Sequence, residues 1–479
     1  MRLPIPPSSL AGTATYRDLP GFVKKLLHPS LRFPLRANQR GMAPTLPAPE
    51  ILVFRGVRAI DPARQLDDLV DVVVARGKVE RIGRDAASDF TPSLAVAVID
   101  GRGRWLIPAL VELHAHLREP GLEYKEDIAS GLRAAAAGGF AHVCAMPNTK
   151  PVNDNRAITE YMLARARLVD GPSLHPISAI TKGLEGKDLT EMADQKEAGA
   201  VAVSDDGRCV MSSAVMLHAL EYAANFGMPV IQHAEDHVLT EGALMNEGAN
   251  STRLGLRGWP RAAEDSIFAR DIILAETTGG HYHMAHVSTV GAVRLLREAK
   301  ARGLRVTAEV TPHHLLLDDS VLGAYDTVYK VNPPLREPKD QLALREALAD
   351  GTIDCIATDH APHALLEKNC EFAEAAHGMI GLQTCLPLML GMVHDGLLPL
   401  ARMIDALTTA PSRIIGIDAP SLRVGAVAEM CLVDAEKLWV FEEAAILSKS
   451  KNSPFIGRQL RGQVDLTMAN GRIVHGSLA

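Results

Sequence analysis

Eight short apolar runs, most of them separated by stretches with helical spacing, constrain the fold of this chain most strongly. An apolar run, a helix and a further apolar run are typical of a parallel β-α-β unit. Eight such units fit a closed (β/α)8 barrel of the TIM type better than an open sheet. An open doubly wound sheet is the alternative, but no G-x-G-x-x-G turn follows the first run. The runs are Leu106–His116, Phe140–Asn148, Leu174–Thr181, Ala200–Asp206, Pro229–Glu235, His281–Ser288, Arg305–Val310 and Asp354–Asp359. Helical spacing lies between them at Ile128–Ala137, Ala214–Asn225, Asp265–Glu276 and Val290–Arg302.

Both ends of the chain have a different pattern, short β runs separated by turn residues. They are Ile51–Phe54, Asp71–Ala75, Val79–Ile82, Met430–Val433, Leu466–Met468 and Arg472–Val474. Asn470 and Gly471 between the last two runs are a strong hairpin signal. We expect one small β-sandwich built from both ends, residues 49–105 and 418–479, beside a barrel of residues 106–417.

Residues 1–49 form a basic leader, with seven Lys or Arg and a single acid, Asp18. Acid-poor, arginine-rich leaders can be transit peptides, but no hydrophobic core with a cleavage site is visible. We favour the interpretation that translation begins at Met42 and that the residues before it are assigned to the protein in error. Residues 1–48 are therefore expected to be disordered or untranslated.

The charge balance, the hydropathy and the cysteine spacing each argue against a class of protein. Lys and Arg number 50 against 57 Asp and Glu, a net charge of −7, without the basic surplus of a nucleic-acid binder. The uncharged stretch Ala375–His394 contains histidine, Pro387 and three glycines, which argues against a membrane-spanning helix. Six cysteines without a C-x-x-C pair argue against a disulfide framework or a zinc knuckle. We expect a cytoplasmic protein that acts on a small molecule.

Metal-ligand side chains collect at the ends of the predicted strands. His114 and His116 lie two residues apart, so on a strand both point to the same face and can reach one ion. In a parallel barrel the strand ends meet at the carboxyl-terminal rim, where barrel active sites lie. Imidazole plus carboxylate suits zinc or a similar divalent ion, and six such groups favour a binuclear centre with a shared carboxylate. The other candidates lie at the ends of four further strands: Asp205 or Asp206, His233, His286 and Asp359.

Each of these residues also has an ordinary structural interpretation. A lone H-x-H motif is a weak signal, and a lone Asp at a strand end is more often a helix N-cap. A single rim histidine is usually just hydrogen-bonded. The metal interpretation depends on several strands each supplying a ligand type at the same end. The remaining histidines are interpreted as structural, among them His142, His218, His283, His313 and His314.

Longer motifs around these residues resemble the amidohydrolase superfamily and, more narrowly, the bacterial class I dihydroorotases. The resemblance covers most of the chain after residue 49. The L-R-E-P-G that continues the H-x-H motif and the stretch A-T-D-H-A-P-H are specific, whereas H-x-H alone marks only the superfamily. The matching stretches are Val111–Gly121, Ala145–Pro151, Ser204–Gly207, Val306–Leu317, Val331–Arg336 and Ala357–His363.

The resemblance implies a ligand set for two zinc ions per subunit. Hydantoinases and allantoinases are similar but use a carboxylated lysine at the end of the fourth strand, where this chain has Ser204–Gly207 and the nearest lysine is Lys196, upstream. The choice of Asp206 over Asp205 rests on the family pattern, because strand alternation says only that the two face opposite ways. One zinc ion would be held by His114, His116 and Asp359, the other by His233 and His286, and Asp206 would bridge them.

The resemblance also implies a reaction, the reversible ring closure of N-carbamoyl-L-aspartate to dihydroorotate in pyrimidine synthesis. Asp359 would be the catalytic base. Arg118 would pair with the α-carboxylate of the substrate, because a guanidinium presents a fork of donors. His377 departs from the family, which has an apolar residue before Gly378, so its effect on the loop is open. The other substrate contacts implied are His116, Asn148, Asn332, His363 and Gly378.

Two other functions are weighed against this one. Arg118 and the missing lysine of the fourth strand argue against an allantoinase or hydantoinase. A full ligand set argues against a non-catalytic structural partner of aspartate transcarbamoylase. We expect a homo-oligomer, and association of an active chain with aspartate transcarbamoylase stays open.

Overall fold

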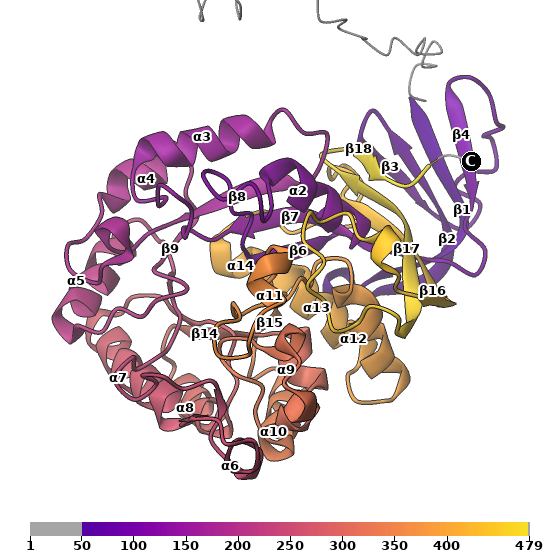
Figure 1. Cartoon of the computed structure of the whole chain (residues 1–479). Helices are drawn as coiled ribbons and strands as arrows, with labels where there is room; N and C mark the ends of the chain where they lie inside the picture. Colours follow the sequence, from indigo (N-terminus) through magenta and orange to yellow (C-terminus); the bar gives the residue numbers. More distant parts are fainter. Residues whose placement is uncertain (1–49, 478–479) are drawn as a thin grey trace, which may run out of the picture. The chain divides into compact units, whose positions relative to one another are not determined.

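Figure 1 shows a computed structural model of the chain, and the structure describes residues 50–477. The prediction about residues 1–48 lies outside the described residues. Two large sheets organise the described chain, a parallel sheet in the middle of the sequence and a mostly antiparallel sheet built from its two ends.

The parallel sheet has eight strands in the order β15-β14-β13-β10-β9-β8-β7-β6. Its first and last strands meet through a parallel bridge between Ala115 and His360, and the N–H of His116 donates to the His360 carbonyl at 2.8 Å. The helices surround this sheet, and the predicted (β/α)8 barrel is confirmed (Figure 1). The strands are β6 (Leu110–Ala115), β7 (Phe140–Ala145), β8 (Ser173–Ser178), β9 (Ala202–Ser204), β10 (Val230–Gln232), β13 (Tyr282–Met284), β14 (Val306–Val310) and β15 (Cys355–Ile356).

The barrel strands read as continuous apolar runs because both of their faces are covered. Every residue of β6 and β7 is buried, since one face points into the barrel and the other packs against helices. The helix that follows β6 begins at Asp127, whose carboxylate accepts the N–H of Ser130 at 2.7 Å as an N-cap. Within residues 50–477 no helix combines the length and apolarity that a membrane crossing requires.

The α-helices are α2 (Ile128–Ala137), α3 (Arg156–Ala166), α4 (Met192–Ala198), α5 (Ser213–Ala224), α6 (Ala249–Leu254), α7 (Ala262–Thr278), α8 (Val290–Ala301), α9 (Pro312–Leu316), α10 (Pro338–Ala349), α11 (Leu365–Lys368), α12 (Cys385–His394), α13 (Leu400–Leu407) and α14 (Thr409–Ile415). Short 3-10 helices are η2 (Pro62–Arg64), η3 (Lys182–Leu184), η4 (Asp319–Ala324), η5 (Thr327–Tyr329) and η6 (Glu443–Ala445). A two-stranded ladder of β11 (Met245–Asn246) and β12 (Gly258–Trp259) lies in the long connection after β10.

The second sheet joins the two ends of the described chain, as the sequence predicts. Its strands pair in the order β18-β17-β16-β5-β1-β2-β3, with β4 beside β1. Asn470 and Gly471 have φ values of 52° and 75° between β17 and β18, the positive pair that a type I′ hairpin requires. The strands are β1 (Ile51–Asp61), β2 (Leu66–Ala75), β3 (Lys78–Gly83), β4 (Val96–Asp100), β5 (Trp105–Pro108), β16 (Met430–Val440), β17 (Gln459–Ala469) and β18 (Arg472–His475).

One predicted element is divided in the structure. The apolar run Leu106–His116 is not one barrel strand, because β5 pairs with β1 and β16 in the second sheet and only β6 belongs to the barrel. Pro108, which lacks an N–H and cannot donate to a ladder, ends β5. The run is apolar throughout because Leu106 is buried in the core of the second sheet and Leu110 in that of the barrel. The domain boundaries stay a prediction.

Candidate metal centre

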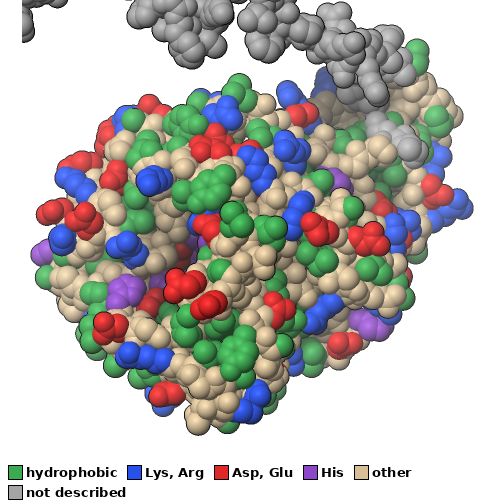
Figure 2. Space-filling view, in the orientation of Figure 1, with side chains coloured by type: hydrophobic (Ala, Val, Ile, Leu, Met, Phe, Trp, Pro, Cys, Tyr) green, Lys and Arg blue, Asp and Glu red, His purple; other side chains and the backbone are tan. Residues whose placement is uncertain are grey.

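The six predicted metal ligands come together at the carboxyl ends of five barrel strands. All six are buried, with at most 6% of any residue exposed. Figure 2 shows a hollow in the middle of the ring of helices, with histidine and acidic side chains around it. His114 and His116 lie at the end of β6, and the others lie within three residues of the end of their strands: Asp206 after β9, His233 after β10, His286 after β13 and Asp359 after β15.

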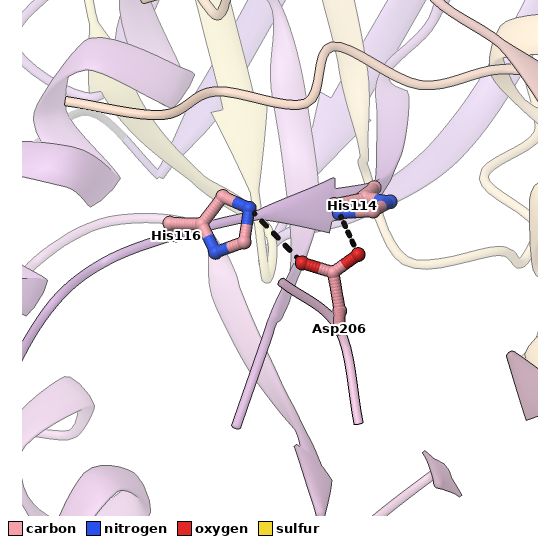
Figure 3. Close-up of side chains that lie close together, drawn as sticks. All are labelled: His114, His116 and Asp206. Carbon is pink, nitrogen blue, oxygen red and sulfur yellow. Dashed lines mark ion pairs between the residues drawn. The ribbon is translucent and has the colours of Figure 1, made fainter. Parts of the chain in front are cut away.

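Asp206 lies at the centre of this group. One carboxylate oxygen, Oδ2, lies 3.4 Å from Nε2 of His116, and Oδ1 lies 3.4 Å from Nε2 of His114 (Figure 3). The same Oδ1 lies 3.5 Å from Nδ1 of His233 and 3.4 Å from Nε2 of His286. Two clusters whose ligand atoms lie within 4.8 Å of one another therefore share this aspartate.

Asp359 borders the first of these clusters. Its Oδ1 lies 3.1 Å from Nε2 of His116 and 3.6 Å from Nε2 of His114. The carboxylate is thus close enough to both imidazoles to share an ion with them after small adjustments of the side chains.

In three of the four histidines, all but His286, the ring nitrogen that faces away from Asp206 is hydrogen-bonded to another described residue. Nδ1–H of His114 donates to Glu309 at 2.5 Å, and Nδ1–H of His116 donates to the side-chain oxygen of Asn148 at 2.9 Å. Such outer partners fix the tautomer and leave the lone pair of the other nitrogen free for a metal.

Unpartnered polar atoms test whether the site fits a metal. Nε2 of His114 and Oδ1 of Asp206 are fully buried, and neither has a hydrogen-bond partner within residues 50–477. Buried polar atoms without a partner are rare in proteins because each loses its contacts with water. Imidazole nitrogens and carboxylate oxygens that converge in this way are the donor set of a zinc-type ion, so the residues fit the metal.

The electrostatics keep the carboxylates ionised. Burial opposes the ionisation of Asp206, but the imidazoles of His114, His233 and His286 around its carboxylate hold its pKa well below the ordinary value. The hydrogen bond from His116 likewise holds the pKa of Asp359 below its ordinary value against the effect of burial. Conversely, Asp206 and Glu309 raise the pKa of His114 well above its ordinary value although burial opposes this. Ionised carboxylates are the state in which these residues can bind a cation.

The two adjacent aspartates differ in orientation. The carboxylate of Asp205 turns away from the histidines and accepts the N–H groups of Ile180 at 2.8 Å and Thr181 at 2.9 Å. Burial raises the pKa of Asp205 to about 6 in spite of these bonds. Of the two, therefore, only Asp206 faces the histidines.

A cavity of about 230 Å³ opens above the clusters. All the residues that the family resemblance implies as substrate contacts line it, together with His233, His286, Asp206 and Asp359. They are His116, Arg118, Asn148, Asn332, His363, His377 and Gly378. The structure thus brings the predicted ligands and the predicted substrate contacts into one site.

Arg118 places a buried positive charge in this cavity. The residue is 8% exposed, its Nε donates to the Pro362 carbonyl at 3.3 Å, and a terminal nitrogen lies 3.4 Å from Nε2 of His363. Within the described residues no carboxylate forms an ion pair with this guanidinium. Burial and the charge of Arg118 lower the pKa of His363 to about 2, so the imidazole is neutral. A buried guanidinium without a counter-ion is suited to an anionic ligand.

Three site residues have a backbone conformation that L-amino acids rarely adopt. The φ values are 63° for Arg118, 31° for His286 and 44° for Asp359. A left-handed non-glycine residue costs of order 1–3 kcal/mol and persists where the surrounding structure over-determines it. The fold therefore holds these three side chains in place at some cost in stability.

Several residues that complete the site were not found from the sequence. Glu309 on β14 also contacts Nε2 of His283 at 3.2 Å and accepts the N–H of His286 at 3.3 Å. Glu235 accepts from Nε2 of His233 at 3.1 Å. Two signals were available in the sequence. Glu309 is an acid inside the apolar run V-T-A-E-V, and Glu235 lies two residues after the candidate ligand His233.

A parallel barrel whose carboxyl rim holds two His/Asp clusters sharing one aspartate defines a hydrolase of the amidohydrolase type. The family model described as "Dihydro-orotase-like" matches residues 103–291. A dihydroorotase of Anaeromyxobacter dehalogenans is 52% identical over 428 residues, 89% of this chain and 98% of that protein. The chain belongs to the dihydroorotase family.

Further similarities agree with this assignment. A dihydroorotase of Trichlorobacter lovleyi is 49% identical over 423 residues, 88% of this chain and 99% of that protein. Among solved structures, L-hydantoinase from Arthrobacter aurescens superposes with a TM-score of 0.78 at 24% identity, over 89% of this chain and 96% of that one. The hydantoinase shows that the fold is shared.

Proposed function

We propose that the protein catalyses the dihydroorotase reaction, the reversible interconversion of N-carbamoyl-L-aspartate with dihydroorotate and water in pyrimidine synthesis. The observation that carries the proposal is the position of Arg118, a buried guanidinium without a counter-ion in the same cavity as the Asp206-centred clusters. Dihydroorotate has a carboxylate to pair with that guanidinium and a cyclic amide to place over the clusters. The names of the half-identical relatives support the same reaction.

The proposed cofactor is a pair of zinc ions per subunit. The distances around Asp206 and the unpartnered Nε2 of His114 support this ligand set. Ions in such a site lower the pKa of a bound water to about 7 and polarise a carbonyl group. One ion would be held by His114, His116 and Asp359, the other by His233 and His286, with Asp206 between them.

Asp359 is the proposed catalytic acid and base. In the hydrolytic direction the oxygen of water bonds to the ring carbonyl carbon and the ring C–N bond breaks. Asp359, which lines the cavity, accepts the proton of that water and delivers it to the departing nitrogen. In the reverse direction the ureido nitrogen bonds to the carbon of the side-chain carboxylate and Asp359 takes one proton from that nitrogen. Asp359 passes this proton to the departing carboxylate oxygen, which leaves as water with a second proton taken up from solvent.

The remaining cavity residues orient the substrate. Arg118 pairs with the α-carboxylate, with Asn148 and His363 beside it. Asn332 donates its side-chain N–H to Glu235 at 2.9 Å, which leaves its oxygen to accept from a ring N–H. His377 and Gly378 line the cavity, and the ring of His377 packs against that of Trp259 at a centroid distance of 6.2 Å.

A metal-supplemented assay with dihydroorotate, hydantoin and allantoin in parallel tests the proposal. We expect turnover of dihydroorotate, and formation of dihydroorotate from N-carbamoyl-L-aspartate in the reverse assay. Turnover of hydantoin or allantoin without turnover of dihydroorotate would show that the proposed substrate is wrong. No turnover of any of the three by a metal-loaded, folded protein would indicate a non-catalytic role.

The assembly of the protein is a separate proposal. We propose that the protein forms a homo-oligomer. Aspartate transcarbamoylase is the heterologous partner to test. Light scattering after size-exclusion chromatography, with and without that enzyme, measures both.

A further inference from the structure

The loop after β15, residues 363–378, forms a wall of the cavity and borders a second space. One part, with His377 and Gly378, lines the 230 Å³ cavity, and another part, with Leu365 and Asn369, lines a second hollow of about 490 Å³. His363 lines both spaces. A segment with open space on two sides needs specific bonds to keep one conformation.

Lys330 provides two of these bonds. The residue is only 2% exposed, and its ammonium donates to the carbonyls of Phe372 at 2.7 Å and Ala373 at 2.9 Å. Its own carbonyl accepts the N–H of Gly378 at 2.8 Å. Lys330 lies two residues before Asn332, so it ties the segment with this predicted substrate contact to the loop that carries another.

Lys368 extends the connection from within the loop. The residue is 7% exposed, and its ammonium donates to the Ala376 carbonyl at 2.8 Å and to the Lys330 carbonyl at 3.2 Å. Together the two ammonium groups donate to three carbonyls of the segment 372–376. The Lys330 carbonyl links them to the end of the loop, because it accepts from the Lys368 ammonium and from the N–H of Gly378.

Neither ammonium has a counter-ion. Within the described residues, all the hydrogen bonds that these two groups donate go to backbone carbonyls. Burial lowers the pKa of both lysines, that of Lys368 to about 7. A buried ammonium without a counter-ion is unfavourable, so the charged form of both groups is disfavoured. Both lysines lie beside the cavity that also holds Arg118. An anionic substrate in that cavity would compensate their positive charge.

We propose that Lys330 and Lys368 form a clamp that positions the loop 363–378 against Asn332 and supplies positive potential for the anionic substrate. They are positioning residues, because they act through the backbone of Gly378 and His377 and do not line the cavity themselves. The inference rests on the proposed function for the identity of the substrate, but the clamp itself is a property of the loop.

The test uses K330M and K368M in the full-length, metal-loaded protein, with K339M as the matched control. Lys339 has a side chain 63% exposed and pairs with Glu337 on the outside of the barrel. We expect KM for dihydroorotate to rise about tenfold or more in both clamp variants, the effect of losing hydrogen bonds from a charged group. We expect kcat to stay within about threefold and bound metal to be unchanged, and hydrogen exchange of amides 372–378 to become faster. K368R, for which the adjoining hollow has room, should recover most of the KM.

The outcomes separate the clamp from the proposed function. KM within twofold of the wild type in both variants, or kcat and metal content that fall as much as KM rises, would overturn the clamp. Unchanged exchange of amides 372–378 would overturn it as well. If the wild type does not turn over dihydroorotate, the proposed function fails and the exchange measurement still decides the clamp. If K330M does not fold, K368M and K368R give the same decision.

Discussion

Replacing Glu309 tests whether the barrel interior is built to hold a metal. The Oε1 atom of Glu309 lies 2.5 Å from Nδ1 of His114, and Oε2 lies 3.2 Å from Nε2 of His283. E309Q keeps the size of the side chain but directs an amide N–H toward one of these two ring nitrogens. The histidine then loses either its orientation or its correct tautomer. All three residues are fully buried, so water cannot replace the lost bond.

The size of the effect follows from the kind of bond that is lost. A hydrogen bond to a charged group is worth about 1.5–3 kcal/mol. The loss corresponds to a fall of about 10–100-fold in metal affinity, the range usual for partners of metal-bound histidines. We expect the upper half of this range because the contact is short and inaccessible to water. Titration of the metal-free protein with zinc against a chromogenic chelator measures the dissociation constant.

A matched control exists at a distance from the site. Oε2 of Glu429 lies 3.0 Å from Nε2 of His142, which is also a carboxylate–histidine pair, partly buried and next to the second sheet. E429Q should leave metal affinity within twofold of the wild type. The reasoning would be refuted if E309Q bound zinc as tightly as the wild type, or if E429Q lost as much affinity as E309Q.

Three further predictions concern catalysis, substrate binding and stability. D359N should keep the fold and the far-ultraviolet circular dichroism spectrum but abolish turnover, and near-normal kcat would exclude Asp359 as the base. R118K keeps the charge but loses the fork of donors, so KM for dihydroorotate should rise about 10–100-fold, the effect of one lost charged hydrogen bond; an unchanged KM would place the carboxylate elsewhere. Burial lowers the pKa of His175 and of His281 to about 4 from 6.5. The unfolded chain therefore binds protons between pH 6.5 and 4 that the native state does not, and the free energy of unfolding falls as pH drops through this window. Urea unfolding of H175N and H281N should show a shallower fall than the wild type, and equal slopes would contradict the assignment.

Much of the site was predictable because it depends on local position in the sequence. A residue at the end of a parallel strand lies at the carboxyl rim whatever the neighbouring strands are. His114, His233 and His286 therefore needed only the strand assignment to be brought to the same end. The structure places them all within 3.5 Å of Asp206.

What could not be predicted depends on contacts between distant strands. Alternation along a strand separates Asp205 from Asp206 but does not say which faces the histidines. Glu309 reaches His114 from β14, which only β15 separates from β6, although the two residues lie 195 apart in sequence. The division of the run Leu106–His116 is likewise decided by its partners, because nearly every residue of β5 and β6 is buried. Such pairings are set by tertiary register and leave no pattern in a single sequence.

The metal content of two neighbouring variants tests the central claim most directly. Asp206 faces four histidines, whereas Asp205 bonds to the backbone of Ile180 and Thr181. The account predicts about two equivalents of zinc and dihydroorotase activity in the wild type and in D205N. In D206N it predicts less than one equivalent and no activity. Two equivalents of zinc in D206N, or none in the wild type, would contradict a binuclear centre built on Asp206.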